Sequence, residues 1–291
     1  MAVLANSDLS GITIDRKWDT KLLPARYAAS VLMPLVLNKS DMVRDSGETI
    51  SIDIEPTLSV GTVTAATGQF TPSAPVPTQI NITVNTWVYV SIEITKQSDI
   101  QSFWKTDSWF PSAAAKAMAI DYDQKLAALH SSVAAGNTVG VGAPDNFSDV
   151  MARAGMLRLS DLNVPKDSLT FALPPVALYN GWYAKEVLTA AHSSGFKKNL
   201  NVSGEMPSIL GIPVREATTI ASSTEGGIAV RKAMLLHKQA LGIAMQLNHS
   251  YKLVDRESAG FLSKAGVTNS LYGTAVVRSD HFIVFNVLAN A

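Results

Sequence analysis

Apolar and polar positions alternate in two stretches of the chain, residues 50–60 and residues 80–95. A period of two is typical of a β-strand with one buried face. Prolines at positions 72, 75 and 77 separate the stretches and predict a loop, because proline cannot pair in a central strand. Residues 80–95 predict one unbroken strand of roughly 50 Å at about 3.3 Å per residue. Few strands of a single domain are so long, so the pattern predicts a two-stranded arm that projects from the body.

The predicted arm carries no charge, since no Asp, Glu, Lys or Arg occurs from Pro56 to Ile92. Natural proteins usually guard exposed strand edges with charged side chains, and an isolated two-stranded ribbon is only marginally stable in water. The pattern therefore favours an arm that lies on another subunit. The alternative, that both strands lie inside a larger sheet of the same chain, stays open. The side chains expected to contact a neighbouring subunit are Leu58, Val60, Phe70, Ile82, Val84, Trp87, Val88 and Val90.

Two helices are predicted on either side of the arm. The longer one runs from Pro111 to Gly136, where apolar side chains recur at steps of three and four residues. At 1.5 Å per residue it is about 36 Å long, enough to serve as a spine. A short helix is predicted from Pro24 to Met33, and Pro34 then ends or kinks it.

Short helices and strands alternate after a glycine-containing joint at 136–142. Helices are predicted at 147–159 and 174–191, and strands at 168–173, 209–220, 232–236 and 251–255; residues 240–246 are ambiguous. Residues 271–278 and 282–288 predict a hairpin at the end of the chain. The predicted architecture is α+β with a projecting β arm.

Composition narrows the function classes. The 24 Lys and Arg balance the 24 Asp and Glu, and only 16% of residues are charged, a composition that promotes association. Neutrality argues against a dedicated nucleic-acid binder with a basic face. Cysteine is absent, which excludes disulfides, thiolate catalysis and Cys-based zinc sites. The first residues do not resemble a signal peptide, and no apolar run is long enough to predict a membrane span.

Local motifs for chemistry are lacking. The five histidines have no metal-ligand spacing, and no dinucleotide fingerprint, P-loop or nucleophile elbow occurs. Asp121 and Asp123 resemble a carboxylate pair, but residues two apart on a helix point to different faces, so both are expected at solvent or at an interface. The aromatic residues at 103–104 and 109–110 favour a hydrophobic corner where arm and helix meet the body, with a ligand-binding box as the alternative. No catalytic, cofactor or metal site is therefore predicted.

The order of several motifs resembles that of the major capsid proteins of tailed bacteriophages, which have the Hong Kong 97 fold. The sequence around the arm contributes the Gly-Glu-Thr-Ile opening at 47–50, the uncharged loop and the strand ending Tyr-Val-Ser-Ile-Glu-Ile at 89–94. Further motifs are Ile-Asp-Tyr-Asp at 120–123, Leu-Pro-Pro at 173–175, Leu-Gly-Ile-Pro-Val at 210–214, Leu-Tyr-Gly at 271–273 and Val-Val-Arg-Ser-Asp at 276–280. The resemblance covers about residues 15–290.

The resemblance implies a specific domain organisation. The expected parts are an N-terminal arm (1–45), an extended β-hairpin loop (46–95), a peripheral domain with the spine helix (96–139), an axial domain (140–247) and a return to the peripheral sheet (248–291). Some family members crosslink covalently through a lysine in the extended loop, but none occurs from 56 to 92. A shell without such crosslinks is therefore expected.

The resemblance also implies a function: a structural protein, not an enzyme, that assembles into pentamers and hexamers of an icosahedral phage head enclosing double-stranded DNA. It implies assembly in the host cytoplasm and location in the virion. The expected partners are further copies of the chain, a scaffold protein, a portal, possible decoration proteins and loosely contacted DNA, with no membrane and no cofactor. Two alternatives stay open: the shell of an encapsulin nanocompartment and, from another class, a soluble α+β hydrolase or binding protein.

Overall fold

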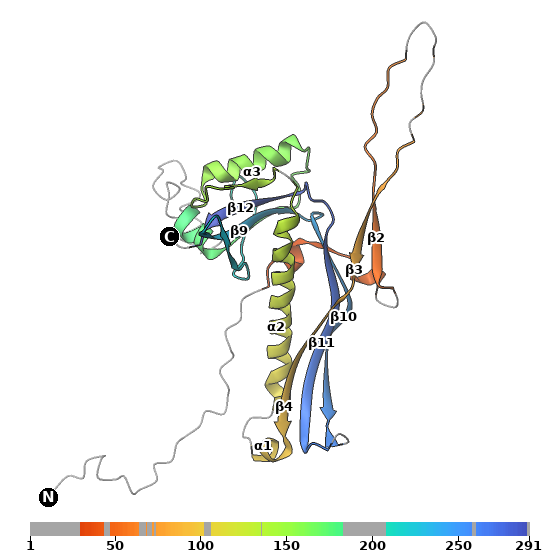
Figure 1. Cartoon of the computed structure of the whole chain (residues 1–291), viewed down its shortest axis with the longest axis vertical. Helices are drawn as coiled ribbons and strands as arrows, with labels where there is room; N and C mark the ends of the chain where they lie inside the picture. The colour runs from red at the N-terminus through yellow and green to blue at the C-terminus, as the bar shows by residue number, and fades with distance from the viewer. Residues whose placement is uncertain are drawn as a thin grey trace, which may run out of the picture.

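Three β-sheets and one long helix organise the molecule. The structure is a computed structural model that describes residues 30–43, 47–63, 68, 72, 74–101, 106–134, 136–182, 208–257 and 260–289. Figure 1 shows the long helix upright, a sheet of long strands beside it, a second sheet at its upper end and a hairpin that projects beyond both. The architecture confirms the predicted α+β class with a projecting arm.

A four-stranded sheet, here called the long sheet, runs along the helix. Its strands follow the order β1 (Leu37–Asn38), β10 (Leu241–Asp255), β11 (Ser263–Val276) and β4 (Thr86–Thr95). β10, β11 and β4 are antiparallel neighbours, and β1 is parallel to β10. Helix α2 (Thr106–Ala128) covers one face of this sheet (Figure 1).

Side chains that alternate along the long sheet explain its contact with α2. Val88 and Val90 of β4 pack into the same apolar cluster as Met118 of α2. Tyr272 of β11 meets the Tyr122 ring edge to face, with ring centroids 4.8 Å apart. The intervening residues of β4 face away from the helix and are exposed.

A six-stranded sheet forms the second unit of the fold. Its order is β5 (Thr138–Val139), β12 (Phe282–Leu288), β9 (Ile228–His237), β6 (Leu169–Leu173) and β7 (Val214–Glu216), with β8 (Ser222–Glu225) also paired to β9. Helix α3 (Asp149–Asp161) lies against one face. Gly155 makes this approach possible, because a Cβ atom there would lie 2.5 Å from the Phe285 ring.

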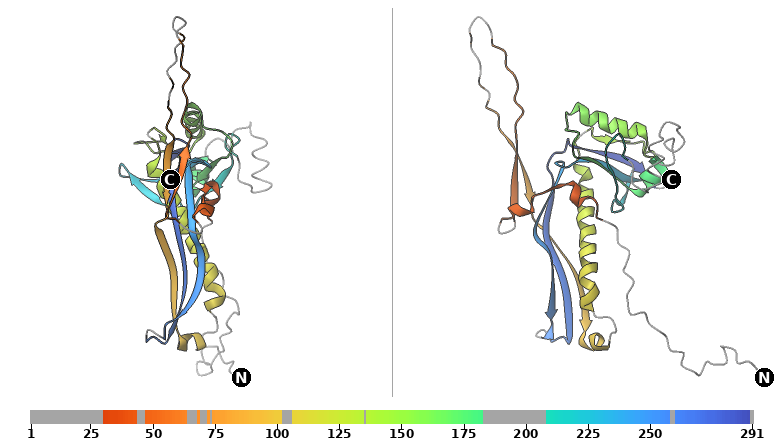
Figure 2. Two further views of the ribbon diagram at one scale, coloured as in Figure 1. Left: turned by 90° about the vertical axis from the view of Figure 1, so that its right-hand side faces the viewer. Right: turned by 180° about the vertical axis from the view of Figure 1, so that it is seen from behind.

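The arm is shorter than the sequence predicts. β2 (Thr49–Ile54) pairs with β3 (Thr78–Thr83) in an antiparallel ladder of six residue pairs. The predicted strand 80–95 is wrong as one unit, since it divides between β3 in the arm and β4 in the long sheet. The alternative of a larger sheet in the same chain therefore holds for β4, and among the described strands it is β2 and β3 that form the projecting hairpin (Figure 2).

The predicted hairpin at the end of the chain is also wrong. β11 pairs with β10 and β4, whereas β12 pairs with β9 and β5, so the two strands belong to different sheets. The end of the segment 248–291 therefore lies in the six-stranded sheet. The long hairpin of the structure is instead β10–β11, which includes residues 241–246 of the stretch that the sequence leaves ambiguous.

The predicted helices are largely recovered, with shifted boundaries. α2 begins at Thr106 and carries Pro111 inside its second turn, and a 3-10 turn at Leu129–Ser132 continues it. α3 begins two residues later than predicted. Pro34 lies within a 3-10 turn, Met33–Leu35, and the rest of the helix predicted before it lies outside the described residues. The predicted helix at 174–191 is described as a π-helix at Ala177–Trp182 and beyond Trp182 lies outside them.

Candidate assembly surface

The base of the arm is fixed to the body by side chains of the chain itself. Ile82 is 0% exposed and Val84 4%, and both pack with Ile50, Ala244 and Val277. Ile82 and Val84 were expected to contact a neighbouring subunit, and this expectation is wrong because the body of the same chain already covers them. The arm therefore has a rigid base.

Two glycines on the long sheet allow the arm to cross it closely. A Cβ atom at Gly273 of β11 would lie 2.1 Å from the carbonyl oxygen of Thr83. A Cβ atom at Gly242 of β10 would lie 2.7 Å from Ile82 Cδ1. Because the clash at 273 is with backbone, that position needs glycine, whereas at 242 the Ile82 and Val277 side chains would have to shift. The arm base therefore covers the upper end of the long sheet.

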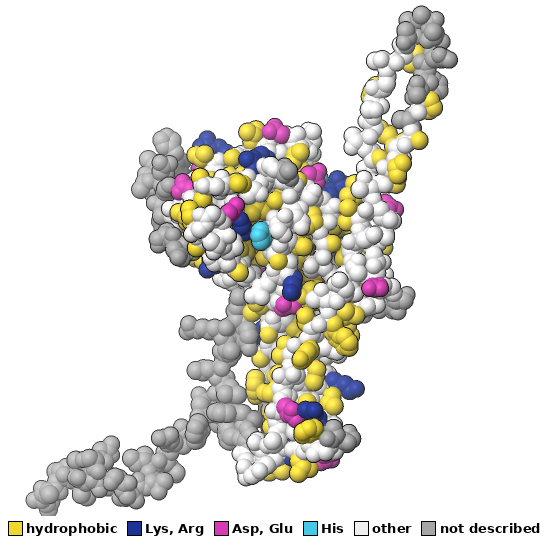
Figure 3. Space-filling view, viewed as in Figure 1, with side chains coloured by type: hydrophobic (Ala, Val, Ile, Leu, Met, Phe, Trp, Pro, Cys, Tyr) yellow, Lys and Arg dark blue, Asp and Glu magenta, His cyan; other side chains and the backbone are white. Residues whose placement is uncertain are grey.

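Beyond its ladder the arm exposes apolar side chains. Val60 is 98% exposed, and Leu58, Val63 and Val76 also face solvent. The described part of the arm shows only apolar and uncharged side chains beyond its base (Figure 3). Leu58 and Val60 are thus available to another subunit, while Phe70 lies outside the described residues.

The remaining residues predicted to contact a neighbouring subunit lie on opposite faces of β4. Val88 and Val90 face α2 and are half-buried, so they contribute to the core of this chain. Trp87 lies on the opposite face and is 72% exposed, and Tyr89 beside it is 71% exposed. Of the three predicted contacts on this strand, only Trp87 faces outward.

The face of the long sheet that points away from α2 is apolar next to the arm base, whereas Ser91 and Glu93 of β4 make it polar toward the far tip. Register partners across a sheet point to the same side. Trp87 pairs with Leu271 and Leu271 with Leu247, so the three side chains form a row. Figure 2, left, shows this face toward the viewer with α2 behind it. Below the arm base, no described segment covers the face.

Ion pairs surround the far tip of the long sheet. They join Lys96 to Glu257, Arg256 to Glu93 and Lys264 to Asp99. The hydroxyl of Ser263 donates to Glu93, and this bond together with the Arg256 charge lowers the pKa of the Glu93 carboxyl. Between the pairs, Ile100, Phe261 and Leu262 are exposed. Apolar centres with charged rims are typical of protein contacts.

The two carboxylates of α2 are structural. Asp123 is fully buried and accepts hydrogen bonds from the Ser30 hydroxyl and the N–H groups of Val31, Leu32 and Met33, at 2.9, 2.5, 3.2 and 3.1 Å. It thereby ties the N-terminal segment to the helix. The expected placement of Asp123 at solvent or an interface is wrong, and the sequence offers no signal for partners some ninety positions away.

Asp121 binds a different partner on the long sheet. Its carboxylate accepts a 2.6 Å hydrogen bond from the Tyr272 hydroxyl. Burial and this carboxylate raise the pKa of the Tyr272 phenol, so the hydroxyl keeps its proton and the bond holds β11 to α2. The predicted aromatic corner is described only at 109–110, where Phe110 packs against Tyr251 of β10 with centroids 6.0 Å apart. Phe103 and Trp104 lie outside the described residues.

Two histidines meet where the chain passes between the sheets. His237 ends β9 and His281 precedes β12, and their rings lie edge to face 5.5 Å apart. The N–H of His237 donates to the carbonyl of His281 at 3.1 Å. Burial, followed by the charge on His281, lowers the pKa of His237. Both rings are buried, so the pair belongs to the packing of this junction.

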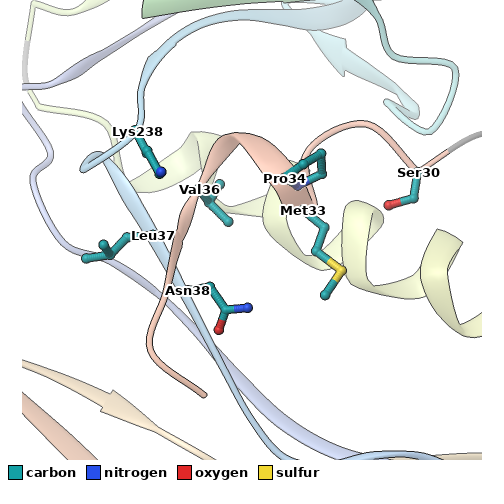
Figure 4. A pocket seen from close by; sticks show the side chains of 7 residues that line it. All are labelled: Ser30, Met33, Pro34, Val36, Leu37, Asn38 and Lys238. Atoms are coloured by element: carbon teal, nitrogen blue, oxygen red, sulfur yellow. The ribbon is translucent and has the colours of Figure 1, made fainter. Parts of the chain in front are cut away.

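The hollow beside β1 has little catalytic character. It measures about 430 Å³ and is lined by Ser30, Met33, Pro34, Val36, Leu37, Asn38 and Lys238 (Figure 4). Lys238 is its single charged residue, and no nucleophile with an adjacent base lines it. Among the described residues no three His, Asp or Glu side chains gather as a metal site would require. None of the helices described here combines the length and apolar character needed to span a membrane.

Comparison with known proteins identifies this arrangement. No protein-family model matches the chain, and no curated protein matches its sequence. A structure from Mycobacterium phage Che8 matches with a TM-score of 0.76 at 18% identity, over 94% of this chain and 96% of the other. The capsid of cyanophage P-SCSP1u matches with a TM-score of 0.71 at 15% identity, over 99% and 97%. The mature capsid of bacteriophage PhiM1 matches with a TM-score of 0.70 at 13% identity, over 99% and 96%. The chain therefore has the α+β fold of phage capsid structures, which the order of its sequence motifs implies.

Proposed function

We propose that this chain is a major capsid protein that self-assembles into the icosahedral head of a bacteriophage. The observation that carries the proposal is the match to phage capsid structures along 94% or more of the chain. The match includes nearly the whole length of the other chains, so the arm, the long sheet and the six-stranded sheet are all parts of the shared fold. An encapsulin shell, a hydrolase or a binding protein is not favoured by these neighbours.

Pentamers and hexamers of this chain enclose double-stranded DNA in the proposed head. The arm extends from a rigid base and lies on a neighbouring subunit, which buries its exposed apolar side chains. Burial of apolar area contributes about 25 cal/mol per Å², so an arm that covers several hundred Å² stabilises the contact by several kcal/mol before the entropy of association is subtracted. Each subunit makes such a contact with its neighbour, and the contributions accumulate around a capsomer.

The shell is held together without crosslinks through an arm lysine. No lysine lies between Pro56 and Ile92, so the arm offers no amine to a neighbour. The role is structural rather than enzymatic. Assembly takes place in the host cytoplasm with a scaffold protein and a portal, decoration proteins are possible additions, and packaged DNA is contacted loosely because the chain has no net charge.

Removal of the distal arm tests the proposal. Replacing residues 55–77 by a two-residue Asn-Gly turn joins Ile54 to its ladder partner Thr78 and preserves the ladder from Thr49 to Ile54 and the buried base. We expect soluble subunits that no longer close into particles, measured by size-exclusion chromatography and negative-stain microscopy. A matched variant keeps the arm length and changes Leu58, Val60, Val63 and Val76 to serine; it should assemble poorly for the same reason.

Two outcomes would contradict this function. Closed particles of the shortened variant would show that the arm is dispensable for assembly. A wild-type chain that stays monomeric under assembly conditions, with and without a scaffold protein, would contradict the capsid role itself. Particles tens of nanometres wide that protect DNA from nuclease are the expected wild-type result.

A further inference from the structure

β4 leaves one edge of the long sheet without a partner. In the described part of the chain it pairs with β11 along its full length and with no other strand. In Figure 2, left, β4 is the gold strand at the margin of the sheet. About half of the N–H and C=O groups of such a strand point away from its only neighbour. From Thr86 to Ile92 this edge carries no charge and no proline, the devices that normally prevent another strand from adding to it.

The segment that follows β2 in the arm, residues 57–63, is called the rising leg here, and its backbone groups also lack partners. The ladder between β2 and β3 ends at Ile54 and Thr78, and no backbone hydrogen bond is found for residues 57–63 within the described chain. This leg contains no proline after Pro56, whereas the returning leg carries Pro72, Pro75 and Pro77 and lacks the corresponding donors. The rising leg is therefore the part of the arm that can form a ladder.

We infer that residues 57–63 of one copy add as a strand to the free edge of β4 in a second copy. The inference rests on the proposed self-assembly and specifies the contact: main-chain hydrogen bonds hold the arm, in addition to apolar burial. Seven residues of the leg and the seven from Thr86 to Ile92 each span about 23 Å at 3.3 Å per residue, so their lengths match. Neither segment carries a charge that pairing would bury.

Side-chain alternation gives this contact a preferred face. Leu58 and Val60 project to one side of an extended leg, as Trp87 and Tyr89 project to the outward side of β4. With these two sets on the same side, cross-strand pairs between aliphatic and aromatic side chains form, and these stabilise paired strands. The new strand then places Leu58 and Val60 beside the apolar row of Trp87, Leu271 and Leu247.

Engineered cysteines test the contact directly, because the chain contains no cysteine of its own. One chain carries Val60→Cys and a second carries Tyr89→Cys, both at exposed positions where the substitution leaves the fold intact. The two chains are mixed, assembled and oxidised, and the crosslinked heterodimer is measured on a non-reducing gel. The same mixture is scanned with Cys at 58 or 59 against Cys at 87 or 89. Val76→Cys, exposed but on the proline-bearing leg, is the matched control.

Strand addition predicts strong crosslinking for position 58 or 60 with 87 or 89, at least fivefold above that for position 59 and for Val76→Cys. In parallel, hydrogen exchange of residues 57–63 and 86–92 should slow on assembly. Particles that form but crosslink equally at all positions, or not at all, would overturn the inference and leave the capsid function intact. If no particles form under any condition, the capsid function fails first.

Discussion

The two large sheets of this protein differ in how many of their faces are covered. In the six-stranded sheet, Ile283 and Phe285 of β12 pack into the cluster beneath α3, while Phe282 and Val284 pack into the opposite cluster with α2. The long sheet has α2 on one face, and among the residues that the structure describes only the arm base covers its outward face. A sheet that is covered on both faces contributes mainly to the core of the subunit. A sheet that is covered on one face has a second face that other subunits could contact. We therefore expect the six-stranded sheet to contribute most to stability and, under the proposed function, the outward face of the long sheet to contact other subunits.

The largest effect on the free energy of unfolding is expected from a substitution of Phe285 in the six-stranded sheet. Its ring is fully buried and lies 5.4 Å from the Phe147 ring and 6.2 Å from the Phe171 ring, measured between centroids. Phe285→Ala should lower the free energy of unfolding of unassembled subunits by about 3–5 kcal/mol, because it removes a large buried side chain and leaves a cavity. Urea denaturation followed by fluorescence measures the change.

Trp87→Ala provides the matched substitution on the half-covered sheet. Its side chain is exposed in the single chain, so the free energy of unfolding should change by less than about 0.5 kcal/mol. Particle yield should nevertheless fall. If both substitutions destabilise the isolated subunit equally, the division of roles between the two sheets is wrong.

The contrast between the sheets also shows which strands can be assigned to a sheet from their hydrophobic pattern. β11 alternates between buried and partly exposed residues, whereas β12 is buried at almost every position, as expected of a strand covered on both faces. A short connection between two strands favours a hairpin, although here the two strands differ in their patterns of hydrophobicity. That difference was the available signal that the strands lie in different sheets.

The division of the run from Ile80 to Thr95 had no such signal. Val84 packs into the cluster at the arm base and Val88 into the cluster beneath α2, and both positions have the same parity. Alternation is therefore preserved across the bend at Asn85. The partner of β4 is β11, some 180 positions away in the chain, and a local pattern cannot identify it. The exposure of Leu58 and Val60 on the arm was predictable, because it follows from local alternation and the lack of charged residues.

An intermediate effect is expected where the arm base crosses the long sheet. Gly273→Ala places a Cβ atom 2.1 Å from the Thr83 carbonyl oxygen, so the backbone of β3 or β11 must shift. We expect a loss of about 2 kcal/mol in the free energy of unfolding, or an arm displaced from the body, since overpacking typically costs 1–3 kcal/mol. Urea denaturation measures the first, and protease cleavage near Asn85 the second.

Gly266→Ala on the same strand is the control. Its nearest atom would be a ring carbon of Tyr251 at 3.3 Å, a side chain that can yield slightly. This variant should keep a stable fold and a protected arm base. Suppose that both variants lose the same free energy of unfolding. The close approach of the arm base to β11 would then not be the cause of the loss in Gly273→Ala.

The smallest effect concerns the junction between the two sheets, where pH should alter stability. His237 is buried among His281, Asp167 and Arg278, and its Nδ1 accepts the Gln239 N–H. Burial, with His281 and Arg278, lowers the pKa of His237 below its ordinary value of 6.5. The folded chain thus binds fewer protons than the unfolded chain as pH falls below 6.5, so stability decreases in that range. We therefore expect unassembled subunits to be less stable at pH 5 than at pH 7.

Thermal unfolding at a series of pH values measures this dependence. His237→Gln keeps an acceptor for Gln239 but cannot take up a proton, so its stability should vary less over the same range. His249→Gln, at an exposed position of β10, should retain the wild-type dependence. If wild type and His237→Gln lose equal stability on acidification, carboxylates elsewhere determine the acid response. The two histidines would then stabilise the junction through packing alone, and the protonation of His237 would not contribute to the pH dependence of stability.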